Sequence, residues 1–535
     1  MKDAVKDLVL RMTGGNAAVA EICASAVTDV EEGDVCRRVS EEEAKALAAE
    51  PSVACFADAA SGEDCAETPF VVCGDLLYTR RNWRYERNVA RRIAAMAASV
   101  SGGDVELPAN EFYARLRDEQ RAAVVAMCKA QFSILTGGPG TGKTHTIARA
   151  VRYLQETRPG LRLALAAPTG KAAARMTESM AKAGIVSAPA TTIHSLLGSR
   201  PDLVSFRHGR ENPLAVDWLI VDEASMIGLP LMAKLLDALP EGCKLTLVGD
   251  VDQLASVERG RVFGDLCRLP GVSISRLRES ARFPPDGEIA RLADAVNGNR
   301  PDEAMSILKG GGGIVGYARL GAASAASPGT WPGFVELCRE KFARFAACQD
   351  ARTALDRLND FRVLCALREG PFGVERLNAF IKTRLGKRCP IPMTITRNDN
   401  LQAVANGDVG VVMPDEPKVL HLPGDDGPRR IRLELLPATE LAFATTIHKS
   451  QGSEFGDVAI VLPPDGENLL LTREILYTGI TRTKGSVRVY AGDEAVRACC
   501  RKSVERVTGL TGFCSANDAT GGGNDKIGAR AKRLK

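Results

Sequence analysis

The 535-residue sequence lacks several features that mark whole classes of protein. It has no run of 18 apolar residues, which excludes a membrane-spanning helix. Its first thirty residues lack a basic start followed by an apolar block, so we expect no secretory signal. Lys and Arg (70) exceed Asp and Glu (66) by only four, so contact with nucleic acid must depend on local patches rather than on overall charge.

The fifteen cysteines also lack a pattern. They are odd in number, lie scattered from Cys23 to Cys514, and show no C-x2-C spacing. The adjacent Cys499 and Cys500 cannot hold a metal alone. These features exclude a disulfide framework and a zinc site, and they predict reduced, buried thiols in a cytoplasmic protein.

What is present is ordinary globular composition, 45% hydrophobic and 25% charged, in a chain long enough for three or four domains. Residues 1–66 hold fourteen acidic against six basic side chains, and six arginines follow within residues 79–96. Tyr85, Val89, Ile93 and Met96 there form one apolar stripe of a helix. The Gly- and Pro-containing stretch 99–110 predicts a linker, so we expect an N-terminal domain over 1–108 that is small and helical.

Two blocks of short apolar runs alternate with helical stretches. The first block has runs at 132–136, 162–167, 218–221 and 245–248, and the second at 363–366, 458–462 and 487–490. Such runs predict parallel strands buried on both faces, hence an α/β protein with two parallel-sheet domains, at 109–297 and 361–505. We expect a helical connector over 298–360 and a C-terminal tail over 506–535 that is disordered from residue 515 onward.

A glycine-rich loop lies in the first block. The string GGPGTGKT fits G-x4-G-K-[ST], with an apolar strand before it and a helix after it. Glycines let backbone amides surround phosphate oxygens, Lys143 would reach the β- and γ-phosphates, and the Thr144 hydroxyl would bind Mg²⁺. The nucleotide-binding residues expected from this loop are Gly137, Gly138, Pro139, Gly140, Thr141, Gly142, Lys143, Thr144 and His145.

Acidic and amide side chains end two further strands of this block. Asp222 and Glu223 follow the run WLIV, where Asp222 can hold Mg²⁺ and Glu223 can act as general base. Asp250 and Gln253 follow the run LTLV, where Gln253 can sense the γ-phosphate. These residues predict an enzyme that hydrolyses ATP with Mg²⁺, without saying what the hydrolysis drives.

Seven ordered strings resemble the motifs of superfamily 1 helicases of the RecD-like group. They are LRDEQRAAV, APTGKAAARMTES, TTIHSLLG, GDVDQL, LRESARFP, AFATTIHKSQGSEF and LTREILYTGITRTK. The resemblance covers nearly the whole chain and implies two RecA-like motor domains with ATP between them. It assigns adenine recognition to Gln120. It also places catalytic arginines at Arg282 and Arg482, which join Lys143, Glu223 and Gln253 as the expected catalytic residues.

The resemblance also implies single-stranded DNA held across both domains by hydroxyl, amide and cationic donors. The expected DNA-binding residues are Pro168, Thr169, Gly170, Lys171, His194, Thr446, His448, Lys449 and Gln451. From the residues alone, the two histidines could equally be packing side chains, and Lys171 and Lys449 could be solvated surface charges.

Two inserted segments indicate which members of the RecD-like group the chain resembles. Residues 198–217 have the length of a hairpin, which the resemblance identifies with a strand-separating pin and which could also be a plain surface hairpin. Residues 398–440 resemble an SH3-like insertion over the DNA channel, and Asn406-Gly407 predicts a hairpin turn within it. The 5′→3′ direction of movement is implied by the resemblance alone.

The N-terminal region resembles that of exonuclease V alpha subunits. This implies docking onto RecB-like and RecC-like subunits, a role in double-strand break repair by homologous recombination, and a chain that acts on single-stranded and duplex-end DNA. An acidic N-terminal domain suits a protein interface, although it could be merely solvated. The alternative is a free-standing RecD-like helicase, which usually carries a longer N-terminal extension.

Other enzyme classes fit less well. A small-molecule kinase would not need the motifs beyond the phosphate loop, and an inactive scaffold would not be expected to keep Lys143, Glu223 and Arg482 together. No acidic cluster outside the ATP site suits a two-metal nuclease, so exonuclease V activity is expected only of an assembled complex.

Overall fold

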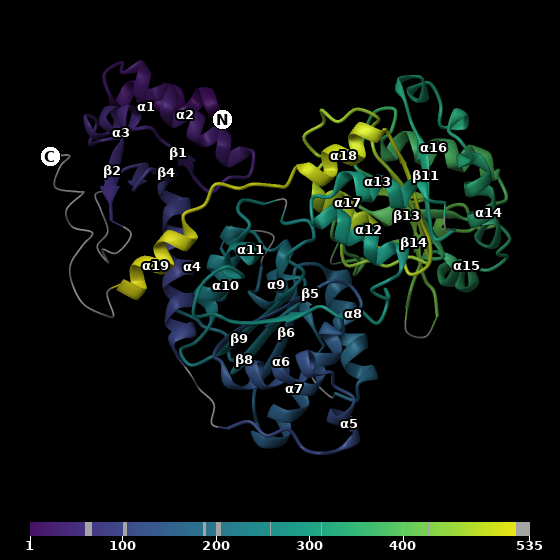
Figure 1. Cartoon of the computed structure of the whole chain (residues 1–535), viewed down its shortest axis with the longest axis horizontal. Coiled ribbons are helices and arrows are strands. Elements are labelled where there is room, and N and C mark those ends of the chain that lie inside the picture. Colours follow the sequence, from purple (N-terminus) through teal and green to yellow (C-terminus); the bar gives the residue numbers. More distant parts are fainter. Residues whose placement is uncertain are drawn as a thin grey trace.

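The computed structural model describes residues 1–58, 67–99, 104–185, 189–199, 205–256, 258–311, 313–399, 401–424 and 427–519. Figure 1 shows an N-terminal domain and two α/β lobes, with the final helix lying beside the N-terminal domain. Among the helices that the structure describes, none is both long and apolar enough to cross a membrane.

The N-terminal domain packs helices on a four-stranded sheet of order β1-β4-β3-β2, so it is not purely helical as expected. Its elements are α1 (Lys2–Met12), α2 (Ala17–Glu31), β1 (Arg37–Arg38), α3 (Glu41–Ala48), β2 (Ala54–Ala57), β3 (Phe70–Cys73), β4 (Leu76–Thr79) and α4 (Arg80–Ala98). The predicted stripe of α4 is confirmed, because Val89, Ile93 and Met96 are buried. They share one core with apolar side chains of α10 (Leu229–Ala238) in the first lobe, and this core joins the two domains.

The first lobe is a parallel six-stranded sheet of order β10-β5-β9-β8-β6-β7 with helices on both faces. Its elements are α5 (Glu111–Ala114), α6 (Asp118–Lys129), β5 (Phe132–Gly137), α7 (Lys143–Thr157), β6 (Leu163–Ala167), α8 (Gly170–Lys182), β7 (Thr191–Thr192), α9 (Ile193–Leu196), β8 (Trp218–Val221), η1 (Ala224–Met226), α10 (Leu229–Ala238), β9 (Lys244–Gly249), α11 (Val262–Leu266) and β10 (Ser273–Leu277). The four predicted apolar runs are β5, β6, β8 and β9.

The second lobe is a parallel five-stranded sheet of order β11-β20-β19-β12-β18. Its elements are α12 (Glu288–Asn297), α13 (Pro301–Lys309), β11 (Val315–Arg319), η2 (Ala322–Ala325), η3 (Pro328–Thr330), α14 (Phe334–Ala346), α15 (Ala351–Arg357), β12 (Phe361–Cys365), α16 (Val374–Leu385), β18 (Ala444–Thr446), η5 (His448–Ser450), β19 (Asp457–Val461), α17 (Arg473–Ile480), β20 (Val487–Ala491) and α18 (Asp493–Arg501).

The expected connector over 298–360 is not a connector. Strand β11 pairs along its whole length with β20, and α12 and α13 bury apolar side chains in the same core as α17 and α18. The prediction failed because β11 (VGYAR) is short, is followed by a small-residue stretch, and has only one neighbouring strand. The second lobe therefore includes residues before 298.

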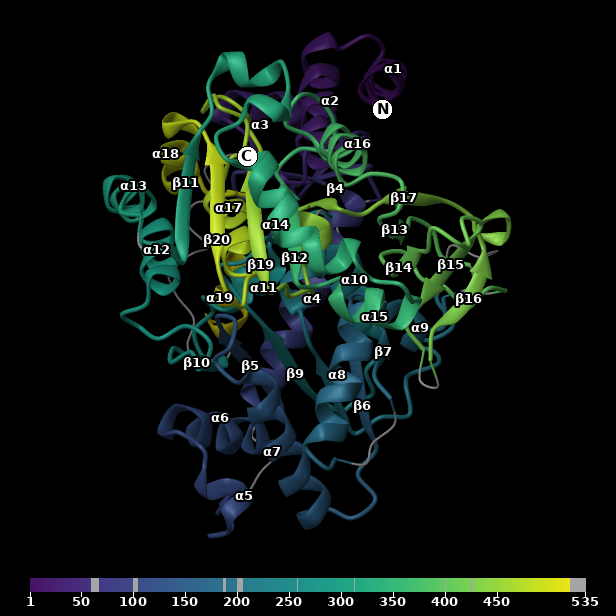
Figure 2. The same cartoon turned by 90° about the vertical axis from the view of Figure 1, so that its right-hand side faces the viewer.

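An antiparallel sheet projects from the side of the second lobe (Figure 2), in the order β16-β15-β14-β13-β17. Its elements are β13 (Ile391–Ile395), β14 (Val409–Val412), β15 (Val419–Leu422), β16 (Arg429–Arg432), η4 (Leu433–Leu435) and β17 (Thr439–Leu441). The inserted sheet thus starts at Ile391 rather than at 398. Gly407 has a φ of 94°, but its turn closes a long loop between β13 and β14 instead of a two-residue hairpin.

The expected hairpin over 198–217 falls partly outside the described residues, which omit 200–204. In the described part, residues 205–217 form no strand, and Gly209 and Asn212 make an isolated bridge. The linker predicted at 99–110 also lies partly outside, since 100–103 are not described.

A C-terminal strap, residues 502–514, runs from α18 back to the N-terminal domain (Figure 1). The Val507 amide donates to the Asp34 carboxylate at 2.9 Å, and the Val507 carbonyl accepts from the Val35 amide at 3.0 Å. Phe513 packs 6.2 Å from Tyr78, measured between ring centres. Helix α19 (Leu510–Ala519) continues into the stretch expected to be disordered, and residues 520–535 lie outside the described part.

The cysteine prediction holds for most of the chain. Among the described residues, thirteen cysteines are free and buried, and burial raises the pKa of Cys23, for example, to about 12. Cys55 departs from the prediction, because it takes part in a disulfide.

Glu86 of α4 is buried where the strap crosses the N-terminal domain. It accepts hydrogen bonds from the Thr508 hydroxyl and from the Gly509 amide, at 3.1 Å for the latter. Burial raises its pKa to about 7. The folded protein therefore favours the protonated form of Glu86. This preference adds to the free energy of unfolding in full below the ordinary pKa of 4.5, and the added stability is lost as the pH rises toward 7.

We expect Glu86→Gln to remove this pH dependence, because an amide does not ionise. Between pH 4.5 and 7.5 the free energy of unfolding of the wild type should fall relative to that of the variant by up to about 3 kcal/mol. Denaturant unfolding at several pH values measures the difference. Two parallel pH profiles would contradict the assignment.

Candidate functional site

The phosphate loop joins β5 to α7 through a turn that only glycine fits. Gly140 and Gly142 have φ of 76° and 87°, in the left-handed region. A Cβ at Gly142 would lie 2.6 Å from Nε2 of Gln120, and one at Gly140 would lie 2.4 Å from Cβ of Arg282. The loop is therefore held between Gln120 of the first lobe and the segment that leads to the second.

Polar side chains of the loop bond to its own backbone. Lys143 Nζ donates to the carbonyls of Gly137 and Gly138, at 2.5 and 3.1 Å, and Thr141 Oγ1 donates to Gly138 at 2.8 Å. Gln120 Nε2 donates to the Thr141 carbonyl at 3.1 Å. The ammonium of Lys143 is thus folded against the loop and would have to turn outward to reach a phosphate.

Two carboxylates face the loop from the end of β8. Glu223 has a φ of 52°, a strained value for a non-glycine residue, and its amide donates to Asp222 Oδ1 at 2.8 Å. Burial, together with the neighbouring Glu223 carboxylate, raises the pKa of Asp222 to about 6, while Lys143 lowers it. A cation between these groups and the loop would relieve the repulsion.

The end of β9 connects the loop to the second lobe. Gln253 Nε2 donates to Asp250 Oδ2 at 2.8 Å, and the Tyr477 hydroxyl of α17 donates to the same oxygen at 3.2 Å. A Cβ at Gly138 would lie 3.2 Å from the Tyr477 oxygen. Tyr477 therefore touches both the phosphate loop and the strand-end carboxylate from the opposite lobe.

Arg482 and Arg282 reach the loop from the other side. Arg482 follows α17, is 3% exposed, and donates to the carbonyls of Thr478 and Ser453, each at 3.3 Å. A cavity of about 230 Å³ separates the lobes. Its walls include Lys143, Thr144, His145, Asp222, Glu223, Gln253, Arg282 and Arg482 together with Gly138, Pro139, Gly140, Thr141 and Gly142.

The cavity thus gathers the expected catalytic side chains from both lobes. Gln120 lies behind the loop, against Thr141 and Gly142, rather than in this wall. Burial, with nearby Arg149 and Arg117, lowers the pKa of His145 to about 4, so this imidazole is neutral at pH 7.

Four of the expected DNA-binding residues of the first lobe lie at the start of α8 or on α9. Thr169 caps α8 by accepting from the Ala172 amide at 3.2 Å, Lys171 is exposed, and a Cβ at Gly170 would lie 3.6 Å from Cβ of Ala405. Ala405 belongs to the long loop of the inserted sheet. His194 on α9 is exposed and lies 5.8 Å from the Phe206 ring.

Residues 446–451 approach α8 from the second lobe. A Cβ at the adjacent Gly452 would lie 3.8 Å from Cβ of Ala172. The Thr446 hydroxyl accepts from the Lys449 amide, and Lys449 Nζ lies 3.2 Å from Glu440 of β17. His448 is partly buried, and burial lowers its pKa.

Gln451 lies elsewhere than expected. It is 8% exposed, and its Nε2 donates to the Leu254 carbonyl at 2.9 Å. The Leu254 amide in turn donates to Thr478 of α17 at 3.1 Å. Gln451 is therefore a contact between the lobes beside the nucleotide cavity, because the chain turns inward after Ser450, and its amide is not offered to a DNA strand in this arrangement.

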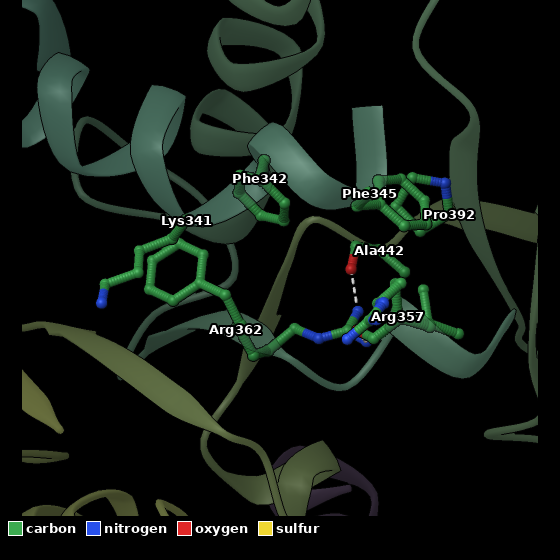
Figure 3. A pocket seen from close by; sticks show the side chains of 9 residues that line it. Lys341, Phe342, Phe345, Arg357, Arg362, Pro392 and Ala442 are labelled. Carbon is green, nitrogen blue, oxygen red and sulfur yellow. Dashed lines mark hydrogen bonds between the residues drawn. The ribbon is translucent and has the colours of Figure 1, made fainter. Parts of the chain in front are cut away.

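A buried arginine holds the backbone just before residues 446–451. Arg362 on β12 donates to the Ala442 carbonyl beneath Phe342 and Phe345 of α14 (Figure 3). It also donates to the Leu358 carbonyl at 3.0 Å, and burial lowers its pKa to about 10. Ala442 lies between β17 and β18, so Arg362 anchors the point where the inserted sheet rejoins the lobe.

The sequence reasoning missed Arg175 of α8 and Glu454 after η5, which line the cavity, and Tyr477, which contacts the phosphate loop beside it. All three lie inside quoted motif strings, so the signal was present. Their roles depend on contacts across the lobes, which no local spacing predicts.

Two family models match parts of the chain. A model described as an AAA domain matches residues 120–259, which hold the phosphate loop, Glu223 and Gln253. A model described as a UvrD-like helicase C-terminal domain matches residues 441–490, which hold Glu454, Tyr477 and Arg482. The two matches thus cover the two sides of the cavity.

Several named proteins are similar to most of the chain. The RecBCD enzyme subunit RecD of Mycolicibacterium smegmatis is 38% identical over 465 residues, which cover 82% of each chain. The ATP-dependent RecD2 DNA helicase of Deinococcus radiodurans is 30% identical over 492 residues, covering 89% of this chain and 59% of that one. A crystal structure of Bacteroides Pif1 bound to ssDNA aligns at 19% identity and a TM-score of 0.39, over 72% of this chain and 92% of that one.

Proposed function

Because the chain belongs to the RecD family of helicase subunits, we propose that it is an ATP-dependent DNA helicase that moves 5′→3′ as the motor subunit of a RecBCD-type complex. The observation that carries the proposal is the cavity that holds Lys143 of one lobe and Arg482 of the other. Exonuclease V activity would belong to the assembled complex, in double-strand break repair by recombination and in the cytoplasm.

ATP would lie in this cavity with its phosphates against the loop amides and the N-terminus of α7. Lys143 would leave the Gly137 and Gly138 carbonyls for the β- and γ-phosphates. Glu223 would take the proton of the attacking water, and Gln253 would contact the γ-phosphate from the end of β9. Arg282 and Arg482 would neutralise charge that develops on the transferred group.

The residues present fit Mg²⁺ with the nucleotide. Among the described residues no cluster of three His, Cys, Asp or Glu could hold a metal, whereas Mg²⁺ commonly uses one or two carboxylates plus phosphate oxygens. Thr144 and Asp222 would hold it, and its charge would oppose the burial and the neighbouring Glu223 carboxylate, which together raise the pKa of Asp222. Bound Mg²⁺ supplies charge neutralisation at the β- and γ-phosphates.

Hydrolysis would be coupled to movement through the contacts between the lobes. Tyr477, Thr478 and Gln451 of the second lobe bond to Asp250 and Leu254 of the first. A change at the γ-phosphate would alter these contacts and shift the lobes relative to each other.

Single-stranded DNA would follow the side where α8, the inserted sheet and residues 446–449 meet. Pro168, Thr169, Gly170, Lys171 and His194 would contact it from one lobe, and Thr446, His448 and Lys449 from the other. Duplex-end DNA would be opened at the edge of this path.

The N-terminal domain would dock on RecB-like and RecC-like partners through its acidic surface. A free-standing helicase remains the second candidate because of the RecD2 relative. The RecD subunit is favoured because it is more identical to this chain (38% against 30%) and because the match covers more of its own length (82% against 59%).

Tailed DNA duplexes test the proposal. We expect the chain, alone or with its partner subunits, to unwind a duplex with a 5′ single-stranded tail in the presence of ATP and to leave a 3′-tailed duplex intact. Strand displacement measured by fluorescence follows both substrates. Unwinding from the 3′ tail would contradict the direction, and failure of single-stranded DNA to stimulate ATP hydrolysis would contradict the motor. Co-purification of the tagged chain from its own cells separates a subunit from a free enzyme.

A further inference from the structure

Glu454 is surrounded by cations from three parts of the molecule. Its Oε1 accepts from Nη2 of Arg282 at 2.5 Å and from Nη2 of Arg175, and its Oε2 lies 3.2 Å from Nζ of Lys484. Arg175 comes from α8 of the first lobe, and Lys484 follows α17 of the second. A single carboxylate therefore bridges the two lobes through three cationic side chains.

The same arginines line the nucleotide cavity. Arg175, Arg282 and Glu454 all belong to its wall, with Lys143 and Arg482. The Glu454 side chain is 13% exposed, so its charge is poorly solvated and depends on these partners. Burial alone would raise the pKa of Glu454, but the guanidinium groups of Arg175 and Arg282 lower it to about 2.

Arg282 has capacity for a second anion. Its Nη1 is buried and has no hydrogen-bond partner among the described residues, while Nη2 is occupied by Glu454. Buried guanidinium donors normally find partners, and a phosphate oxygen in the cavity is a suitable acceptor. A carboxylate and a terminal phosphate have the same preference for a guanidinium, so they compete for the same donors.

We propose that Glu454 is an internal substitute for the terminal phosphate of ATP, which holds Arg175 and Arg282 in the nucleotide-free protein and is displaced from them by the γ-phosphate. This inference rests on the proposed function, because it requires ATP in this cavity. It makes Arg175 a further phosphate-binding residue. ADP lacks the third phosphate and leaves the Glu454 contacts in place, so Glu454 helps the protein distinguish ATP from ADP.

Neutralising Glu454 tests the competition. We expect Glu454→Gln to raise the affinity for a non-hydrolysable ATP analogue with Mg²⁺ by about tenfold, because the arginines are then released without displacing a carboxylate. The affinity for ADP should change by less than about twofold. Calorimetric titration of the purified full chain with each nucleotide gives the ratio of the two affinities.

Two further variants and a control distinguish a specific effect of Glu454 from a folding defect. Glu454→Asp retains the charge but shortens the reach, so it should shift the ratio in the same direction by a smaller factor, even if the glutamine variant folds poorly. Adding Arg175→Ala to Glu454→Gln should remove much of the gain. The control is Glu279→Gln, a carboxylate on the same segment as Arg282 that is 67% exposed and pairs with Arg117 outside the cavity; it should leave the ratio unchanged.

The outcomes separate this inference from the proposed function. An unchanged ratio in Glu454→Gln, or a weaker affinity for the ATP analogue, would overturn the inference, since the latter would mean that Glu454 positions the arginines for phosphate. If Lys143→Gln also left ATP hydrolysis intact, the proposed function itself would fail.

Discussion

Replacing Lys143 with Gln is expected to lower DNA-stimulated ATP hydrolysis by at least about a hundredfold. The Lys143 ammonium lies at the start of α7, within reach of the site for the β- and γ-phosphates, and no other lysine lines the cavity in the described part of the chain. An amide of similar length keeps the helix but supplies no charge to the developing transition state. Binding of single-stranded DNA should persist, because the expected DNA contacts lie elsewhere.

Phosphate release during steady-state turnover, with and without single-stranded DNA, measures this effect, and fluorescence anisotropy measures DNA binding. Lys182→Gln is a matched control, since Lys182 ends α8 and pairs with Glu178 on the exposed surface. Turnover unchanged in Lys143→Gln would remove the phosphate-loop assignment.

Replacing Arg482 with Ala is expected to lower kcat by about a hundred- to a thousandfold while changing ATP affinity much less. Arg482 comes from the second lobe and now bonds to two backbone carbonyls, both at 3.3 Å. These weak neutral contacts are readily exchanged for a charged phosphate, and the attraction grows as negative charge develops during transfer. The loss therefore falls on the chemical step.

Single-turnover hydrolysis and nucleotide titration together separate kcat from binding for Arg482→Ala. Arg501→Ala, on the exposed end of α18, serves as the control for loss of an arginine. A large loss of ATP affinity with kcat preserved would show that Arg482 binds the ground state, and the catalytic assignment would then be wrong.

The sequence predicted the parts of the site that are local. A strand, a glycine-rich turn and a helix occupy one continuous string, so the phosphate loop around Lys143 could be placed from sequence alone. The same holds for Asp222 and Glu223, because the carboxyl ends of adjacent parallel strands meet at one edge of the sheet. Ordered motif strings then placed Arg482 on the second lobe.

What could not be predicted depends on contacts between distant segments. Strand β11 has only five residues and is recognised as a strand by its pairing with β20, which is far along the chain. Gln451 was expected at the DNA because it lies in a string that resembles a DNA-contacting helicase motif, yet its amide bonds to Leu254. Glu454 and Arg175 form an ion pair between the two lobes, which the motif string of either residue does not indicate by itself.

The C-terminal strap has a consequence for the order in which the chain can fold. Leu510 and Phe513 complete a core that also holds Tyr78 and Trp83. The apolar surface of the N-terminal domain, which is synthesised first, is therefore covered only after the C-terminal strap has been synthesised. During synthesis this apolar surface would be open to chaperones or to a partner subunit. A chain that ended before Leu510 would leave the core around Tyr78 and Trp83 incomplete, although it would contain every residue of the nucleotide cavity.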